Sequence, residues 1–140
     1  MTDKEKAVKV VDQMFNNDPF SQWLGIERIV DDKGKSTLRM AVRKEMLNGF
    51  AIAHGGIAYA LADSCLAFAS NSHGRKSVSV ETSISHTQPI KEGDTITASA
   101  EEVSLTNKIG IYQIRISNQE NKTVALFKGT VYRTEKIWEV

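Results

Sequence analysis

The sequence has few of the residues and runs that mark several protein classes. Its 140 residues include one cysteine and two prolines, and the net charge is +1 with no long block of one sign. A single cysteine, Cys65, excludes an internal disulfide. The mixed, near-neutral charge gives no electrostatic reason for a nucleic acid or an anionic membrane as the main partner, so we expect neither.

Long apolar runs and leader-like segments are also missing. The longest uncharged stretch, 46–62, contains an asparagine, a histidine and three glycines, and it is too short and too polar to span a membrane. The N-terminal MTDKEKAVKV is charged and lacks the apolar region of a signal peptide. These absences predict a cytoplasmic protein.

The three histidines do not indicate a metal site. His54, His73 and His86 have no ligand-like spacing with Cys65, so we expect no metal and no cofactor. Cys65 itself lies on the apolar stripe of a predicted helix, which favours a core cysteine over a nucleophile.

A composition of 41% hydrophobic and 25% charged residues predicts a folded chain, which we interpret as one domain over 1–140 with a helical segment at 1–20. Helical spacing predicts helices over 3–16 and 54–72. Alternation predicts strands near 24–30, 36–42, 77–84, 95–103, 109–116 and 122–133, with a bulge near Ile111–Tyr112. The short turns make the last four strands antiparallel. The expected fold class is α+β, with one curved antiparallel sheet around one long central helix.

The long predicted helix carries one lone acid. Asp63 is the only charged side chain from His54 to Gly74, and the other positions are nearly apolar on every side. Such a helix is a buried one, and one sheet can cover only one side of it, so the other side should meet a second subunit. Asp63 has no basic neighbour three or four positions away, which makes it a functional candidate. The alternative is that Asp63 accepts a hydrogen bond from an amide or hydroxyl across an interface.

The same helix opens on Gly55-Gly56. Backbone N–H groups at a helix N-terminus are unpaired and partially positive, and glycines allow a ligand to approach them closely. Such amides can hold a developing oxyanion. The alternative is that the two glycines only permit a tight turn into the helix.

The spacing of these two features indicates a dimer. Gly55 and Asp63 are eight residues apart, about 12 Å along a helix, so one reacting carbonyl cannot touch both within a single chain. A two-fold dimer with antiparallel copies of the helix would bring Gly55 of one subunit to Asp63 of the other.

The run LNGFAIAHGGIAYALADSCLAFASNSHG closely resembles the hotdog-fold acyl-CoA thioesterases, specifically the PaaI-like subfamily of phenylacetic acid degradation. Its Asn48-Gly49, His54-Gly55-Gly56 and Asp63 match the motif of that subfamily, and the resemblance extends over nearly the whole chain from about Asn16. It implies a sheet wrapped around the long helix, edge-to-edge homodimers that pair into homotetramers, and hydrolysis of an acyl-CoA thioester. Coenzyme A is then part of the substrate rather than a cofactor.

The resemblance also implies roles for individual residues. The Gly55 amide would polarise the thioester carbonyl, and Asp63 of the other subunit would activate water or attack directly. Asn48 would place the water or the thioester, His54 would support the site, and Ser79 would bind the water or position Asp63.

The substrate-binding residues are predicted only from their proximity to the motif residues in the sequence. Gly56 offers a second amide at the helix start, and apolar candidates for the acyl pocket are chosen by proximity to Asn48 and Asp63. These are Met46, Leu47, Phe50, Tyr59 and Leu66. For the phosphates of coenzyme A the sequence offers basic residues near strand ends without favouring one of them. These are Arg75, Lys76, Lys91 and Lys108.

Two other functions stay open. The first is a non-catalytic acyl-CoA-binding hotdog protein. The second is a hotdog dehydratase or hydratase, against which the Asn48, HGG and Asp63 pattern argues.

Overall fold

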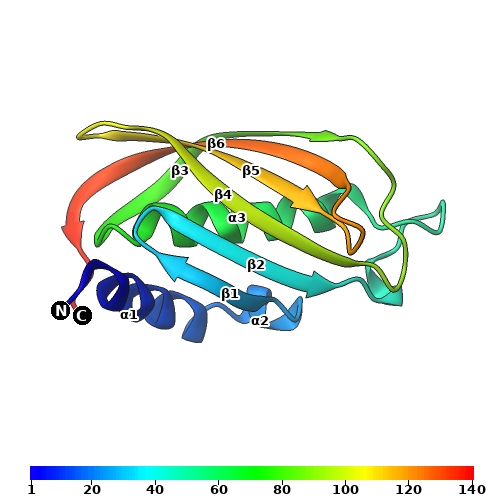
Figure 1. Cartoon of the computed structure of the whole chain (residues 1–140), viewed down its shortest axis with the longest axis horizontal. Coiled ribbons are helices and arrows are strands. Elements are labelled where there is room, and N and C mark those ends of the chain that lie inside the picture. The colour runs from blue at the N-terminus through cyan, green and yellow to red at the C-terminus, as the bar shows by residue number, and fades with distance from the viewer.

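The structure is a computed structural model that describes residues 1–140. One six-stranded antiparallel sheet, in the order β1-β2-β4-β5-β6-β3, curves around the long helix α3 (Figure 1). The elements are α1 (Asp3–Asn16), α2 (Pro19–Trp23), β1 (Glu27–Asp32), β2 (Lys35–Ala41), a 3-10 turn (Lys44–Met46), α3 (Gly55–Asn71), β3 (Arg75–His86), β4 (Thr95–Leu105), β5 (Ile109–Ser117) and β6 (Thr123–Ile137). The predicted α+β fold class is confirmed.

The two long helices and all six strands are present near their predicted ranges, although β1 begins at Glu27 rather than at Leu24. The two elements that were missed are α2 and the 3-10 turn. Helix α2 was not predicted as a separate helix, although its start follows ordinary rules. Asp18 accepts a hydrogen bond from the Ser21 amide at 3.0 Å, and Pro19 occupies the first turn, where no intrahelical donor is needed. The N-terminal segment is therefore two helices, and the second ends at Trp23.

The predicted bulge lies on the wrong strand. Strand β5 keeps one phase, with Gly110, Tyr112 and Ile114 all buried. The extra residue is Val103 of β4, because Glu102 pairs with Tyr112 and the next pair in the register skips Val103. The apparent change of phase in the sequence arises because Ile111 is apolar and faces outward.

A second bulge, in β3, was not foreseen. The pairing with β6 shifts between Ser79 and Glu81, so Val80 is the extra residue. Before it, Ser79 borders the hollow beside α3; after it, Thr82 bonds a side chain of α3 and His86 lies against the start of that helix. The bulge therefore turns odd-numbered and then even-numbered residues of one strand toward the helix.

The core lies between α3 and the concave face of the sheet. Leu66 of α3 packs against β6 at Gly129, where the absence of a side chain lets helix and strand approach closely. At one end α1 closes the core, with Phe15 edge-on to Phe68 of α3. The two chain termini lie close together at this end (Figure 1). None of the helices is long and apolar enough to cross a membrane.

One side of the fold is unpaired. Strand β3 is at the end of the sheet and pairs only with β6, so its outer backbone groups have no partner strand. Val78 and Val80 on this strand are 56% and 61% exposed. A long edge strand with exposed apolar side chains is a template for pairing with another chain.

The close approach at Gly129 generates a stability prediction. A Cβ at this position would lie 3.2 Å from Leu66 Cγ and overlap its methyl groups, and Leu66 is itself buried. We expect Gly129→Ala to destabilise the fold by about 1–3 kcal/mol through overpacking, measured by urea denaturation. Gly49→Ala is the control, because no atom lies within 4 Å of a Cβ built there. Equal denaturation midpoints for the two variants would contradict the packing argument.

Candidate active site

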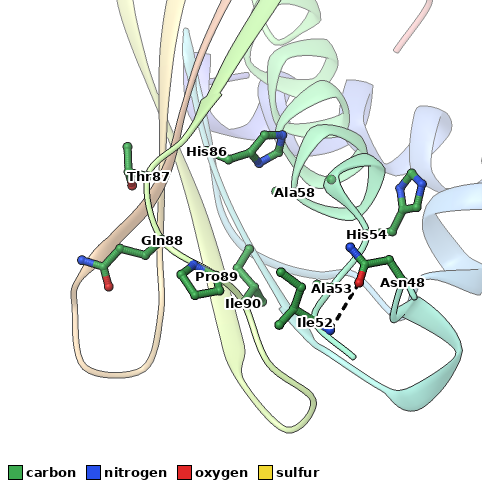
Figure 2. Close-up of a pocket in the computed structure, with 11 residues that line it drawn as sticks. Asn48, Ile52, Ala53, His54, Ala58, His86, Thr87, Gln88, Pro89 and Ile90 are labelled. Atoms are coloured by element: carbon green, nitrogen blue, oxygen red, sulfur yellow. Dashed lines mark hydrogen bonds between the residues drawn. The ribbon is translucent and has the colours of Figure 1, made fainter. Parts of the chain in front are cut away.

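A pocket of about 500 Å³ opens at the N-terminus of α3. Its lining includes Asn48, His54 and Gly55 from the segment that leads into the helix, together with His86 and the loop after β3. Figure 2 shows His86 pointing toward α3, with Asn48 and His54 across the pocket from it. We call this hollow the Gly55 pocket.

His54 controls which helix amide is free. Its Nδ1 accepts a hydrogen bond from the Gly56 amide at 2.9 Å, so His54 is the N-cap of α3. Because Nδ1 is an acceptor, the neutral ring carries its proton on Nε2. The Gly55 amide has no acceptor in the chain. The unpaired donor at this helix end is therefore Gly55, whereas the Gly56 amide is already occupied.

Asn48 shapes the loop before the helix. Its Oδ1 accepts hydrogen bonds from the amides of Phe50 at 2.9 Å and Ile52 at 3.4 Å, the second drawn in Figure 2. This turn holds Ala51 at a φ of 61°, a backbone conformation that such side-chain bonds help to stabilise. The Asn48 Nδ2 group makes no hydrogen bond in the chain, so it remains available as a donor in the pocket.

His86 is the residue that sequence reasoning missed. A Cβ built on Gly55 would lie 3.2 Å from His86 Nε2, so the imidazole ring stands directly beside the helix start. The sequence signal for it was weak: His86 continues the alternation of Thr82 and Ile84, but only the structure shows that these residues face α3. Its ring narrows the approach to the Gly55 amide.

Asp63 lies in a separate hollow of about 250 Å³. Leu66, Ser77 and Ser79 share its lining, so the predicted neighbours Asp63 and Ser79 occur together. The Asp63 side chain is exposed on the open side of α3 and has no hydrogen-bond or ionic partner in the chain. Burial against its neighbours nevertheless raises the pKa of its carboxyl, because desolvation disfavours the charged form. We call this hollow the Asp63 pocket.

The two pockets have no lining residue in common. Asn48, His54 and Gly55 form one group, and Asp63 and Ser79 form the other. A single subunit therefore does not bring the Gly55 amide and the Asp63 carboxylate to one point, in keeping with their spacing along α3.

The predicted acyl-pocket residues are scattered. Leu66 lines the Asp63 pocket, whereas Met46 is buried in the core. Tyr59 packs edge-on against a buried phenylalanine, with its hydroxyl bonded to Thr82. Leu47 forms an isolated bridge with Ala53, and Phe50 is 86% exposed on the loop. Their contact with an acyl group stays a prediction.

Cys65 is inert in this fold. Its thiol is buried and donates to the Ser36 carbonyl oxygen at 3.3 Å, and burial raises its pKa to about 12. A thiol in this state is not a nucleophile at neutral pH. No group of three or more His, Cys, Asp or Glu side chains is placed to hold a metal ion.

Comparison with known proteins places this chain in a family. Residues 50–125 match the model of the thioesterase superfamily. The acyl-coenzyme A thioesterase PaaI of Escherichia coli is 40% identical over 128 residues, which cover 91% of each chain. The chain belongs to the thioesterase superfamily. Within it, the chain is a PaaI-like member with the hotdog fold.

Solved structures of related proteins have the same fold as this chain. The E. coli PaaI structure superposes with a TM-score of 0.95 at 38% identity, over 97% of this chain and 99% of that one. A Thermus thermophilus PaaI variant has a TM-score of 0.81 at 36% identity, over 84% and 100%. A Streptococcus mutans protein bound to acetyl-CoA has a TM-score of 0.78 at 26% identity, over 81% and 91%.

The raised pKa of Asp63 generates a prediction on stability. A carboxyl whose pKa is raised by folding destabilises the folded state once it ionises, and stability falls as pH rises through this range. We expect Asp63→Asn to raise the Tm at pH 7.5 and to have a smaller effect at pH 4.5, at fixed protein concentration.

The control is Glu101→Gln, which changes an exposed carboxyl that makes no hydrogen bond or ion pair. A lower Tm for Asp63→Asn at pH 7.5 would contradict the prediction. It would favour the alternative that Asp63 accepts a structural hydrogen bond across an interface.

Proposed function

We propose that the chain hydrolyses acyl-CoA thioesters with aryl-acetyl groups, such as phenylacetyl or hydroxyphenylacetyl, or with short-to-medium acyl groups. The observation that carries this proposal is the unpaired Gly55 amide at the start of α3, in a thioesterase whose central helix presents one carboxylate with a pKa raised by partial burial. The PaaI relative is named for acyl-CoA hydrolysis and comes from a phenylacetic acid degradation operon, which supports this substrate class.

The proposed reaction uses these two groups in turn. The thioester oxygen accepts a hydrogen bond from Gly55 N–H, and the positive end of the α3 dipole stabilises the charge that develops there. Ionised Asp63 removes a proton from water, whose oxygen attacks the carbonyl carbon, or the carboxylate attacks the carbon itself. Collapse of the tetrahedral intermediate breaks the carbon–sulfur bond and releases the thiolate of CoA, which takes up a proton. In the first route the acyl group leaves as the free acid; in the second it remains on Asp63 as a mixed anhydride, which water hydrolyses to the acid and the regenerated carboxylate. Asn48 donates from Nδ2 to the water or thioester, His54 holds the helix start, and Ser79 positions Asp63.

A homodimer through the free edge of β3 would assemble the site. Asp63 shares its pocket with Val78, and Gly55 lies beside His86. Thr82 is midway between Val78 and His86 in the strand. Two copies of β3 paired antiparallel about a two-fold axis at Thr82 would therefore set Gly55 of one subunit opposite Asp63 of the other. The exposed Val78 and Val80 would be covered in the same contact, and pairs of dimers would form a homotetramer.

The first prediction concerns hydrolysis. Wild type should release CoA from phenylacetyl-CoA or hexanoyl-CoA, detected with a thiol reagent. Asp63→Asn should reduce kcat roughly 100- to 10,000-fold, the usual range for a lost general base. Activity of wild type should fall in acid, at an apparent pKa above that of an ordinary aspartate, because only the ionised carboxylate is reactive.

Cys65→Ala is the control for nucleophile identity and should keep most of the activity, since the thiol is buried. A folded Asp63→Asn protein with wild-type activity would overturn the assignment of Asp63. Failure of wild type on every acyl-CoA tested would remove the proposed substrate class.

The second prediction concerns the shared site. Gly55→Ala would crowd the helix start against His86, and Asp63→Asn removes the base, so each variant alone should be nearly inactive. Co-expressed in equal amounts, they should recover about a quarter of wild-type activity, because half of the dimers are mixed and each mixed dimer has one intact site.

Co-expression of Asp63→Asn with the Cys65→Ala control gives the reference for subunit mixing. No recovery in mixed dimers of Gly55→Ala and Asp63→Asn, with dimerisation verified, would show that both groups act within one subunit.

A further inference from the structure

The imidazole ring of His86 lines the Gly55 pocket but has no part in the reaction described above. The other two histidine rings of the chain are already engaged. His54 accepts a hydrogen bond from the Gly56 amide at 2.9 Å, and His73 Nε2 is hydrogen-bonded to a glutamate at 2.6 Å. Neither ring nitrogen of His86 has a hydrogen-bond or ionic partner in the chain. His86 is therefore the one histidine with both ring nitrogens available to a ligand.

The Nε2 side of this ring faces the start of α3, toward which the side chain points in Figure 2. A Cβ built on Gly55 would lie 3.2 Å from His86 Nε2, closer than to any other atom of the ring. In a helix the Cβ is tilted toward the N-terminus, and the first N–H groups point out of the same end. A carbonyl oxygen that accepts a hydrogen bond from the Gly55 amide is thus within reach of His86 Nε2.

The backbone that carries the ring is held by the sheet. His86 is the last residue of β3 and pairs with Ala125 of β6. The next residue is fixed twice, because Thr87 N–H donates to the Val124 carbonyl oxygen at 2.9 Å and Thr87 Oγ1 donates to that of Thr123 at 3.0 Å. A donor at this position is oriented before the substrate arrives, and preorganised donors are the effective ones for an oxyanion.

The proposed dimer brings the same ring toward the carboxylate of the site. About a two-fold axis at Thr82, His86 is opposite Val78 of the partner subunit, since both are four residues from Thr82 in the strand. Val78 lines the Asp63 pocket. A carbonyl carbon attacked from the Asp63 pocket of the partner, with its oxygen on the Gly55 amide, would therefore lie beside His86.

We propose that His86 is a catalytic residue, whose Nε2–H donates a second hydrogen bond to the thioester oxygen beside the Gly55 amide. This rests on the proposed function, because it assumes that an acyl-CoA carbonyl binds at Gly55. The ring donates from Nε2 as an imidazolium or as the neutral tautomer protonated at that nitrogen. The hydrogen bond strengthens as the oxygen becomes the oxyanion of the tetrahedral intermediate, and it weakens when the intermediate collapses. The proton stays on Nε2 throughout.

The test compares two variants at this position. His86→Phe keeps a ring beside Gly55 and has no donor, whereas His86→Gln keeps a donor in its side-chain amide. Ser85→Ala is the matched control, because Ser85 precedes His86 in β3 and its side chain turns to the opposite face of the sheet. The Tm of each variant is compared with that of wild type to verify folding.

Three ligands separate catalysis from packing. Each protein is assayed for kcat and KM on hexanoyl-CoA, and two analogues that cannot be hydrolysed are titrated by calorimetry. The first is the dethia analogue of hexanoyl-CoA, in which a methylene group replaces the sulfur and the carbonyl remains. The second is S-hexyl-CoA, a thioether without a carbonyl oxygen.

His86→Phe should lower kcat roughly 100-fold, the usual cost of one lost oxyanion donor, and raise KM only a few-fold. The dethia analogue should bind to this variant about two- to tenfold more weakly, the effect of one neutral hydrogen bond. S-hexyl-CoA should bind to wild type and His86→Phe equally, because it has no oxygen for the ring to reach. His86→Gln should retain a higher kcat than His86→Phe, and Ser85→Ala should behave as wild type.

Equal kcat values for wild type and folded His86→Phe would overturn the proposal, as would a lower kcat for His86→Gln than for His86→Phe. An equal loss of affinity for S-hexyl-CoA and for the dethia analogue would also overturn it, because the ring would then only shape the pocket. These outcomes are distinct from failure of the proposed function. If wild type hydrolyses no acyl-CoA yet binds the dethia analogue in a His86-dependent way, the function falls and the contact of His86 with the carbonyl stands.

Discussion

The burial of an apolar helix against one curved sheet is the constraint on which the rest of this structure depends. Helix α3 is nearly apolar on every side, and the concave face of the sheet covers it only in part. Leu66 reaches the sheet at Gly129, where the strand has no side chain, so the helix lies deep in the concave face. The remaining side of α3 stays open beside the unpaired edge of β3, and the carboxylate of Asp63 lies on this side.

This placement gives helix α3 two functional groups of opposite character: a hydrogen-bond donor at its N-terminus and a carboxylate on its open side. Its N-terminus supplies an amide, and His54 occupies the neighbouring Gly56 donor so that Gly55 alone is free. Its side supplies a carboxylate whose charged form is destabilised by the apolar surroundings. Thioester hydrolysis needs both, an electrostatic partner for the oxyanion and a base or nucleophile. The distance between them along α3 makes a second subunit part of the proposed chemistry.

Strand β3 connects these features. The bulge at Val80 lets Ser79 face the Asp63 pocket while His86 faces the Gly55 pocket. The proposed dimer contact and the proposed reaction site thus lie along one strand.

The sequence by itself determined the long elements and the chemical candidates. These are local patterns, which one sequence is enough to show: the helical spacing of apolar residues in 3–16 and 54–72, the Gly55 motif, and a lone acid on an apolar helix. The bulges in β3 and β4 were not readable, because each depends on the register of a neighbouring strand. Nor was the contact of His86 with Gly55. Such contacts join residues far apart in the chain, and only the curvature of the sheet around α3 decides which of them meet.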